Sequence, residues 1–79
     1  MTDNQILIGK LIQETLQEKG VSASWLAKKI HTHPTNMYKI FQKECIDTKL
    51  LMAISIALDT DFFSYYSDFI NEKKSSQIR

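Results

Sequence analysis

The chain contains few of the residues that punctuate or cross-link a small protein: two glycines, one proline and one cysteine in 79 residues. So few turn-forming residues argue against a turn-rich β fold and favour a few helices with short connections. A single cysteine excludes a disulfide within the chain and fits a reducing compartment. No apolar run approaches the roughly 20 residues that cross a bilayer. The first five residues also lack the basic start and long apolar stretch of a secretory signal. We therefore expect a soluble, cytoplasmic protein.

Apolar residues recur at helical spacing along most of the chain. In the first segment Ile8, Ile12 and Leu16 fall four residues apart, which is typical of an amphipathic helix. Gly20 is expected to end this helix, and Pro34 suits the first position of a later one. The expected helices cover residues from about 5 to 19, about 22–30 (with Ser22 as N-cap), about 34–42, a segment after the N-cap Asp47, and an aromatic segment from Asp61 to about Asn71.

This pattern predicts an all-α fold of four or five helices in a single domain over residues 1–71. The chain is 43% hydrophobic, which is ordinary for a globular protein. A domain this short buries only about 60% of its unfolded surface, so one core must hold all the helices. Residues 72–79 are polar and are expected to be a disordered tail.

The charges are unevenly distributed, although they sum to only +1. Between residues 28 and 49 five lysines stand against two acids, with His31 and His33 in the same stretch. Between residues 59 and 72 there are four acids and no base. A phosphate backbone responds to the local field rather than to the total charge of the chain. The basic stretch is therefore a candidate nucleic-acid surface, with a chance cluster of solvated lysines as the alternative.

A break at residues 31–33 separates the second and third helices, because Pro34 disfavours helix for the residue before it. Two short helices joined in this way cross at about 90–120°, and the second can project from the body. A projecting helix fits the major groove of DNA, which is about 12 Å wide. If Met37, Ile40 and Phe41 are buried, the other face carries side chains that can all donate a hydrogen bond and include no acid. These side chains are Thr35, Asn36, Tyr38, Lys39 and Gln42.

From about Ile8 to Tyr66, some three quarters of the chain, the sequence resembles the phage-repressor and Cro type of helix-turn-helix, the XRE-like family. The resemblance rests on GVSASWLAKKI at 20–30, Thr32, MYKI at 37–40, and ISIAL at 54–58. In detail, WLAK at 25–28, NMYKIF at 36–41 and the segment from Ile46 to Phe63 are similar to small transcriptional regulators common in Bacteroides-like bacteria.

The resemblance implies sequence-specific binding of double-stranded DNA by a transcriptional regulator located at the nucleoid, with repression favoured over activation. Residues 34–42 would be the recognition helix. Pro34, Thr35 and Asn36 would lie nearest the base edges, followed by Tyr38 and Lys39. Asn36 could pair with adenine and Lys39 with guanine. The residues expected near the DNA backbone are Ser22, His33, Gln42 and Lys43.

Three features depart from the family pattern. His31 stands where a glycine often permits a positive φ, a conformation that histidine tolerates better than bulkier residues. Leu16 and Phe41 stand where many relatives bury an Arg–Glu pair, and apolar replacement of such a pair is often neutral or stabilising. Pro34 takes an early recognition position that is often polar, which puts one base contact in doubt.

No cluster of residues points to catalysis or to a cofactor. His31 and His33 are too few to hold a metal, and Cys45 lacks the spacing of a metal ligand, so a structural or phosphate-adjacent role is favoured for the histidines. A catalytic cysteine would also need a base and an orienting partner. We expect no enzyme activity, no metal and no small-molecule ligand.

The aromatic residues leave two questions open. Trp25 either packs against the C-terminal aromatics or belongs to a partner-binding patch, and Tyr38 either contacts DNA or is a half-buried surface residue. The five aromatics at 62–69 are more than closure of a small core needs, which makes this region a candidate homodimer interface. The alternative function is a protein-interaction module, such as an antitoxin or adaptor with a repressor-like fold.

Overall fold

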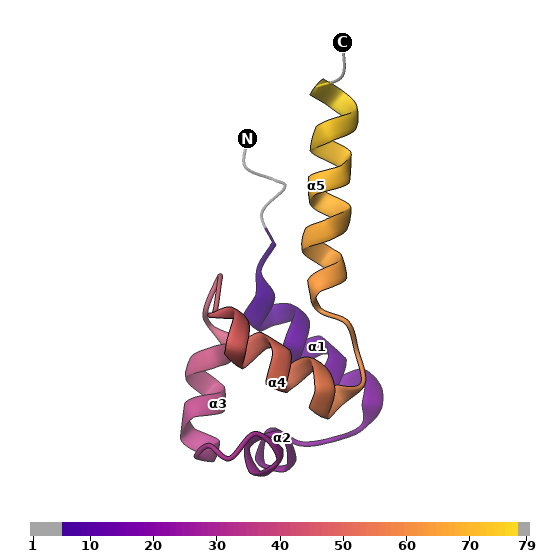
Figure 1. Ribbon diagram of the computed structural model, residues 1–79. Helices are drawn as coiled ribbons and strands as arrows, with labels where there is room; N and C mark the ends of the chain where they lie inside the picture. The colour runs from indigo at the N-terminus through magenta and orange to yellow at the C-terminus, as the bar shows by residue number, and fades with distance from the viewer. Residues whose placement is uncertain (1–5, 78–79) are drawn as a thin grey trace.

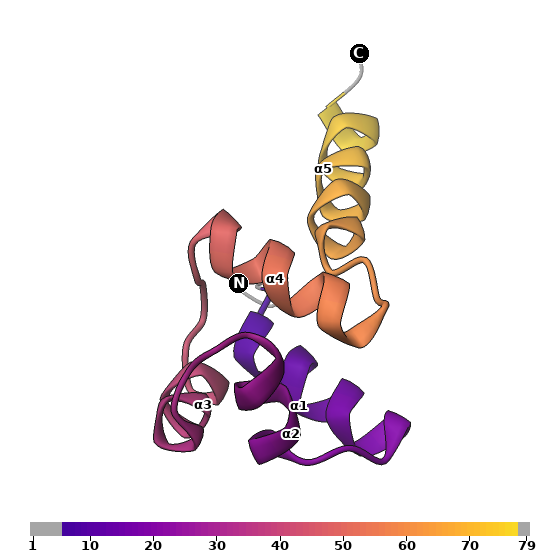
Figure 2. The same ribbon diagram turned by 60° about the horizontal axis from the view of Figure 1, so that its bottom comes forward.

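A computed structural model describes residues 6–77. Within them the chain forms five α-helices and no strand (Figure 1). The helices are α1 (Ile8–Lys19), α2 (Ala23–Lys29), α3 (Pro34–Phe41), α4 (Thr48–Leu58) and α5 (Phe63–Gln77). The first four form a body of crossing helices, and α5 rises from the end of α4 (Figures 1 and 2). The predicted all-helical class is confirmed.

Local signals fix most of the helix ends. The Ser22 side chain accepts a hydrogen bond from the backbone N–H of Trp25 at 3.0 Å, and Asp47 accepts one from Leu50 at 2.7 Å. Both residues are therefore N-caps, as predicted. Gly20 ends α1 in the left-handed conformation, with φ of 70°. Among residues 6–77, no helix is both long enough and apolar enough to cross a membrane.

The first helix begins at Ile8, later than predicted. Leu7 precedes it without a side-chain cap, and the first donors of the helix bond to a different segment. The N–H of Ile8 donates to the carbonyl of Glu44 at 3.4 Å, and that of Gly9 donates to Lys43 at 3.0 Å. These bonds satisfy backbone groups that a helix start leaves unpaired. The predicted start at residue 5 lies outside the described residues.

The last helix continues to Gln77, so the prediction that it ends near Asn71 and that 72–79 is a disordered tail is wrong for the described part. Glutamate and lysine in this segment are good helix formers despite their polarity. The ammonium of Lys73 also lies 5.5 Å from the ring centroid of Phe69, one turn back. Residues 78–79 lie outside the described residues.

A single core holds the first four helices together. Its members are Ile8, Ile12, Leu16, Leu26, Ala27, Met37, Ile40, Leu51, Ile54, Leu58 and Phe62. Phe62 directly precedes α5, whereas α5 itself adds two partly buried aromatic side chains, Phe63 and Tyr66. The core is thus complete near the base of α5, and most of that helix lies outside it.

Gly9 lets α1 touch the end of α3. A Cβ at this position would lie 2.5 Å from the carbonyl oxygen of Phe41 and 2.7 Å from that of Lys43, and closer still to that of Ile40. Real Cβ atoms do not approach so closely. The glycine therefore fixes the first turn of α1 against the C-terminus of α3.

The turn between α2 and α3 is tight and hydrogen-bonded. His31 has the positive φ that was expected there, 60°. The N–H of Thr32 then donates to the carbonyl of Ala27 at 2.8 Å. The turn therefore ends α2 and redirects the chain into Pro34, where α3 begins.

Candidate nucleic-acid interface

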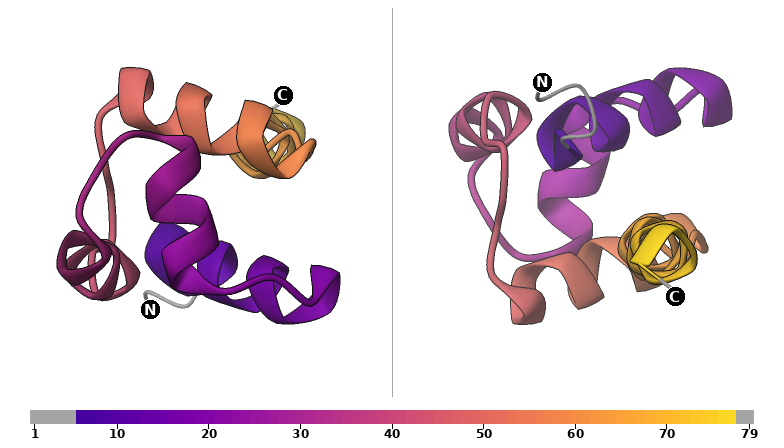
Figure 3. Two further views of the ribbon diagram at one scale, coloured as in Figure 1. Left: turned by 90° about the horizontal axis from the view of Figure 1, so that it is seen from below. Right: turned by 90° about the horizontal axis from the view of Figure 1, so that it is seen from above.

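The third helix forms one flank of the molecule, on the side away from α5 (Figures 1 and 3). It buries Met37 and Ile40 and half-buries Phe41, the three residues predicted to face the core. These contacts attach α3 to the body through one side. The opposite side faces outward.

Every residue predicted to contact DNA is exposed in the structure. These residues are Ser22, His33, Pro34, Thr35, Asn36, Tyr38, Lys39, Gln42 and Lys43. All but Ser22 lie on α3 or directly beside it, and Ser22 stands at the start of α2. Tyr38 is 59% exposed, which favours the reading of this ring as a surface group available for contact over a half-buried one.

Asn36 is held in place by the turn. Its Nδ2 donates to the Thr32 hydroxyl at 2.9 Å. An amide has two N–H donors and one carbonyl acceptor, so one donor and the acceptor stay available for a ligand. That remaining pair is the one a bidentate contact to adenine uses. Thr32 thus orients a site residue, a role that the helical periodicity alone did not reveal.

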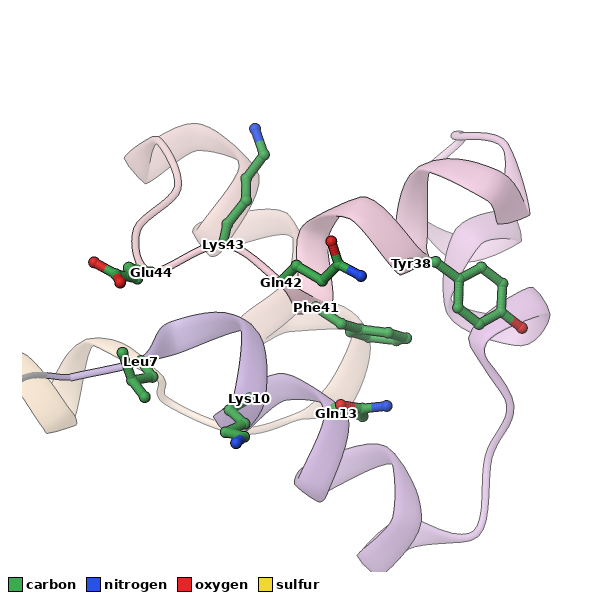
Figure 4. Close-up of a pocket in the computed structure, with 8 residues that line it drawn as sticks. All are labelled: Leu7, Lys10, Gln13, Tyr38, Phe41, Gln42, Lys43 and Glu44. Atoms are coloured by element: carbon green, nitrogen blue, oxygen red, sulfur yellow. The ribbon is translucent and has the colours of Figure 1, made fainter.

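A groove of about 470 Å³ opens between α1 and α3 beside this face (Figure 4). Its lining residues are Leu7, Lys10, Gln13, Tyr38, Phe41, Gln42, Lys43 and Glu44. The rings of Tyr38 and Phe41 meet edge to face, with centroids 5.9 Å apart, and form an aromatic wall. The groove therefore joins three predicted site residues to two from α1, Lys10 and Gln13, which the prediction missed.

Lys10 and Gln13 could have been singled out by one signal only. They are exposed residues three apart on α1, flanking the apolar stripe of Ile8 and Ile12. Residues at that spacing share a helix face. Which neighbour this face meets depends on Gly9, whose close approach to α3 is a property of the folded chain.

The charge around α3 is mainly positive. Lys10, Lys39 and Lys43 are exposed, and Glu44 is the one acid among the residues that line the groove. Lys28 and Lys29 are exposed at the end of α2. A flank with this composition attracts anions and has few groups that would repel a phosphate.

The structure excludes one of the two alternatives left open for Trp25. It is 36% exposed on α2, and the Lys29 ammonium lies 5.3 Å from its ring centroid. Figure 1 places α2 and the rising part of α5 at opposite ends of the molecule. The expected packing of Trp25 against the aromatic residues of α5 is therefore wrong, and the ring remains a surface feature.

The histidines and the cysteine form no metal-binding cluster. Among residues 6–77 there is no group of three or more histidine, cysteine, aspartate or glutamate side chains that could hold an ion. Cys45 is exposed, and it lies close enough to Tyr66 to influence it. Burial raises the pKa of the Tyr66 phenol above its usual value of 10.0, and the neighbouring Cys45 adds a smaller effect in the same direction.

No protein-family model, curated protein or solved structure matches this chain. The function is therefore inferred from the geometry and charge of the α3 flank.

Proposed function

We propose that this protein is a sequence-specific binder of double-stranded DNA, a helix-turn-helix regulator of the XRE-like type. In this proposal α2 and α3 are the paired helices, and α3 is the recognition helix. One observation carries the proposal: α3 is anchored through Met37 and Ile40 while its outward face is polar and free of acid. Such a face can approach the negatively charged groove of a duplex and donate hydrogen bonds to base edges.

The outward side chains divide into two groups by position. Thr35, Asn36 and Lys39 lie on the exposed side of α3 and would meet base edges. His33 and Lys43 flank the helix at its two ends and would meet phosphates. Base contacts provide sequence specificity, whereas phosphate contacts fix the register of the protein on the duplex.

The groove between α1 and α3 extends this interface. Lys10 and Lys43 bring positive charge to its rim, and the amides of Gln13 and Gln42 can donate hydrogen bonds. The exposed ring of Tyr38 offers an apolar surface to a sugar. We propose that one strand of the DNA backbone passes along this groove while α3 occupies the major groove.

The test begins with selection of bound sites from a random-duplex library, followed by titration of the selected duplex. Lys39→Glu should lower the affinity at least about tenfold, since one good base contact alone contributes about 1–3 kcal/mol and the reversed charge also repels phosphate. Asn36→Ala should weaken binding and relax the preference for one base.

Lys19→Glu is the matched control. It makes the same change of charge at the end of α1, which lies on the side of the body away from α3 (Figure 3). Its affinity should stay close to that of the wild type. If Lys39→Glu and Asn36→Ala both bind as tightly as the wild type, the recognition-helix assignment is wrong.

A second candidate function is a protein-interaction module, such as an antitoxin or adaptor. The exposed Trp25 favours it, because large exposed aromatics are enriched where proteins meet. Copurification of a stoichiometric protein partner, together with failure to enrich any duplex from the library, would favour this candidate over DNA binding.

A further inference from the structure

The groove between α1 and α3 is built on fixed backbone. The N–H of Ile8 donates to the carbonyl of Glu44, and that of Gly9 donates to the carbonyl of Lys43. These hydrogen bonds tie the segment after α3 to the first turn of α1. The groove is therefore preformed, and its volume of about 470 Å³ is typical of small-molecule sites, which hold about 300–1,000 Å³.

Polar side chains line both walls of this groove (Figure 4). Lys10 and Gln13 come from α1, whereas Gln42 and Lys43 come from the end of α3 and the residue after it. Within residues 6–77 none of these side chains has a hydrogen-bond or ion-pair partner. Their donors and charges are therefore available to a ligand.

The groove also offers an aromatic surface. Phe41 is half-buried, and its ring meets that of Tyr38 edge to face, so it supports the more exposed ring. Tyr38 is 59% exposed. An exposed aromatic ring beside cationic side chains is the combination on which nucleic-acid bases stack, because every base has a flat π face.

The groups in the groove match the parts of a nucleotide. The edge of a base carries hydrogen-bond donors and acceptors, and a glutamine amide supplies both. A phosphate is bound by lysine ammonium groups. Inorganic phosphate would leave the ring and the amides unused, and an uncharged aromatic compound would leave the lysines unused. The single acid of the lining, Glu44, lies at the opposite end of the groove from Tyr38 (Figure 4).

We propose that the groove between α1 and α3 binds a free purine nucleoside monophosphate. The base lies against Tyr38, and its edge pairs with the amides of Gln13 and Gln42. The phosphate is held by Lys10 and Lys43. A purine fits better than a pyrimidine, because it covers more of the aromatic surface. Helical spacing in the sequence predicts no such ligand, because the groove forms only when α1 lies against α3.

A nucleotide in the groove would also regulate DNA binding, a consequence that rests on the proposed function. Tyr38, Gln42 and Lys43 belong both to the groove and to the candidate DNA interface. A bound nucleotide occupies the path proposed for the DNA backbone, and its phosphate repels the duplex. The two ligands therefore compete, and each lowers the affinity for the other by the same factor.

Isothermal titration calorimetry of the full chain without DNA tests the binding. The probe is AMP, and adenosine and ribose 5-phosphate represent its two halves. AMP should bind at least about tenfold more tightly than either half, since the loss of even one hydrogen bond to a charged group corresponds to about that factor. UMP should bind more weakly than AMP.

Substitutions in the groove test where AMP binds. Tyr38→Ala should weaken AMP binding at least about fivefold, the lower end of the effect of stacking one base. Tyr38→Phe keeps the ring and should recover most of this loss. Gln13→Ala should weaken the binding of AMP but not that of ribose 5-phosphate, because the amide pairs with the base. Gln17→Ala makes the same change one turn further along α1, outside the groove, and should bind AMP as the wild type does.

Titration of AMP into the protein bound to a selected duplex tests the competition. AMP should release the duplex, whereas ribose 5-phosphate at the same concentration should release far less. Failure of AMP to bind at millimolar concentration, or equal affinities for AMP and ribose 5-phosphate, would overturn the nucleotide site. Unchanged AMP affinity in both Tyr38→Ala and Gln13→Ala would overturn it too, and an unaffected duplex would overturn the competition. If the library yields no duplex at all, the proposed function fails while the calorimetry still decides whether the site exists.

Discussion

His31 holds the left-handed backbone at the turn between α2 and α3, with φ of 60°. Side chains with a Cβ disfavour this conformation, and strain of this kind is of order 1–3 kcal/mol. Histidine tolerates it better than β-branched residues, so the turn forms without glycine. The geometry of the turn matters because it sets where α3 begins.

We predict that His31→Gly raises the free energy of unfolding by about 0.5–1 kcal/mol. Relief of the strained φ is partly offset by the greater freedom of glycine in the unfolded chain. His31→Val should lower the free energy of unfolding, because a β-branched side chain fits this region poorly. Urea unfolding of the three proteins measures both changes, and a less stable glycine variant would contradict the argument.

Ionisation of Tyr66 makes the free energy of unfolding depend on pH in the alkaline range. Its pKa is raised above 10.0 in the folded protein, mainly by burial and to a smaller extent by Cys45. The folded state therefore favours the neutral phenol, while the unfolded chain ionises near its ordinary pKa of about 10. The contribution of Tyr66 to the free energy of unfolding is therefore fully present below pH 10. It is lost as the pH rises through the pKa of the folded protein.

The free energy of unfolding should consequently fall above pH 10 more steeply in the wild type than in Tyr66→Phe. The variant lacks the titrating group, and other groups that titrate in this range, such as the lysines, are common to both proteins. Denaturant unfolding at a series of pH values from neutral to alkaline gives the two slopes. Equal slopes would show that burial of Tyr66 does not couple to folding.

At the scale of the elements, each helix up to Leu58 was predictable because its signals are local. The caps Ser22 and Asp47 and the stop at Gly20 act within one turn, and the apolar periodicity follows from burial of one helix face. The same reasoning identified the exposed side of α3. These features depend on neighbours in the sequence, so the sequence alone reveals them.

Most of the features that were not predicted depend on contacts between distant segments. Lys10 and Gln13 became part of the candidate site because α1 lies beside α3, an arrangement that Gly9 permits. The two alternatives for Trp25 stayed open because its helix face does not specify which element lies opposite. The length of α5 was underestimated because polar helix formers carry no apolar periodicity. The first two cases concern which surfaces meet, and helical spacing holds no information about that.

The contact between α1 and α3 gives a prediction at this scale. Gly9→Ala should destabilise the protein by about 1–3 kcal/mol, because the added methyl group would collide with rigid backbone carbonyls at the end of α3. Thermal unfolding followed by circular dichroism measures the loss. Gly20→Ala is an instructive comparison, since its added Cβ meets no atom and only the positive φ of 70° opposes it.

The two glycine variants should also differ in function. Gly9→Ala shifts α1 relative to α3 and should weaken binding of a selected duplex even at temperatures where the variant is fully folded. Gly20→Ala alters the far end of α1 and should bind as the wild type does once it is folded. If both folded variants bind the duplex with equal affinity, the groove between α1 and α3 takes no part in DNA binding.

On the scale of the whole molecule, charge is separated between two surfaces. The α3 flank carries exposed lysines 10, 39 and 43, whereas Asp59 and Asp61 lie at the elbow of α4 and α5. A net charge of +1 conceals this separation. The field of a duplex would orient the molecule with α3 toward the phosphates and the elbow between α4 and α5 away from them.

Salt dependence distinguishes the lysines that take part in this orientation from those that do not. Each phosphate neutralised by the protein releases condensed counterions, so the logarithm of the affinity falls with the logarithm of the salt concentration by about 0.9 per contact. Lys10→Ala and Lys43→Ala should each reduce this slope by about 1 and weaken binding similarly across sequences. Lys19→Ala, at the end of α1 away from α3, should leave the slope unchanged. Titrations at several salt concentrations give the slopes, and a change at Lys19 equal to that at Lys10 would mean that the DNA backbone does not follow the groove between α1 and α3.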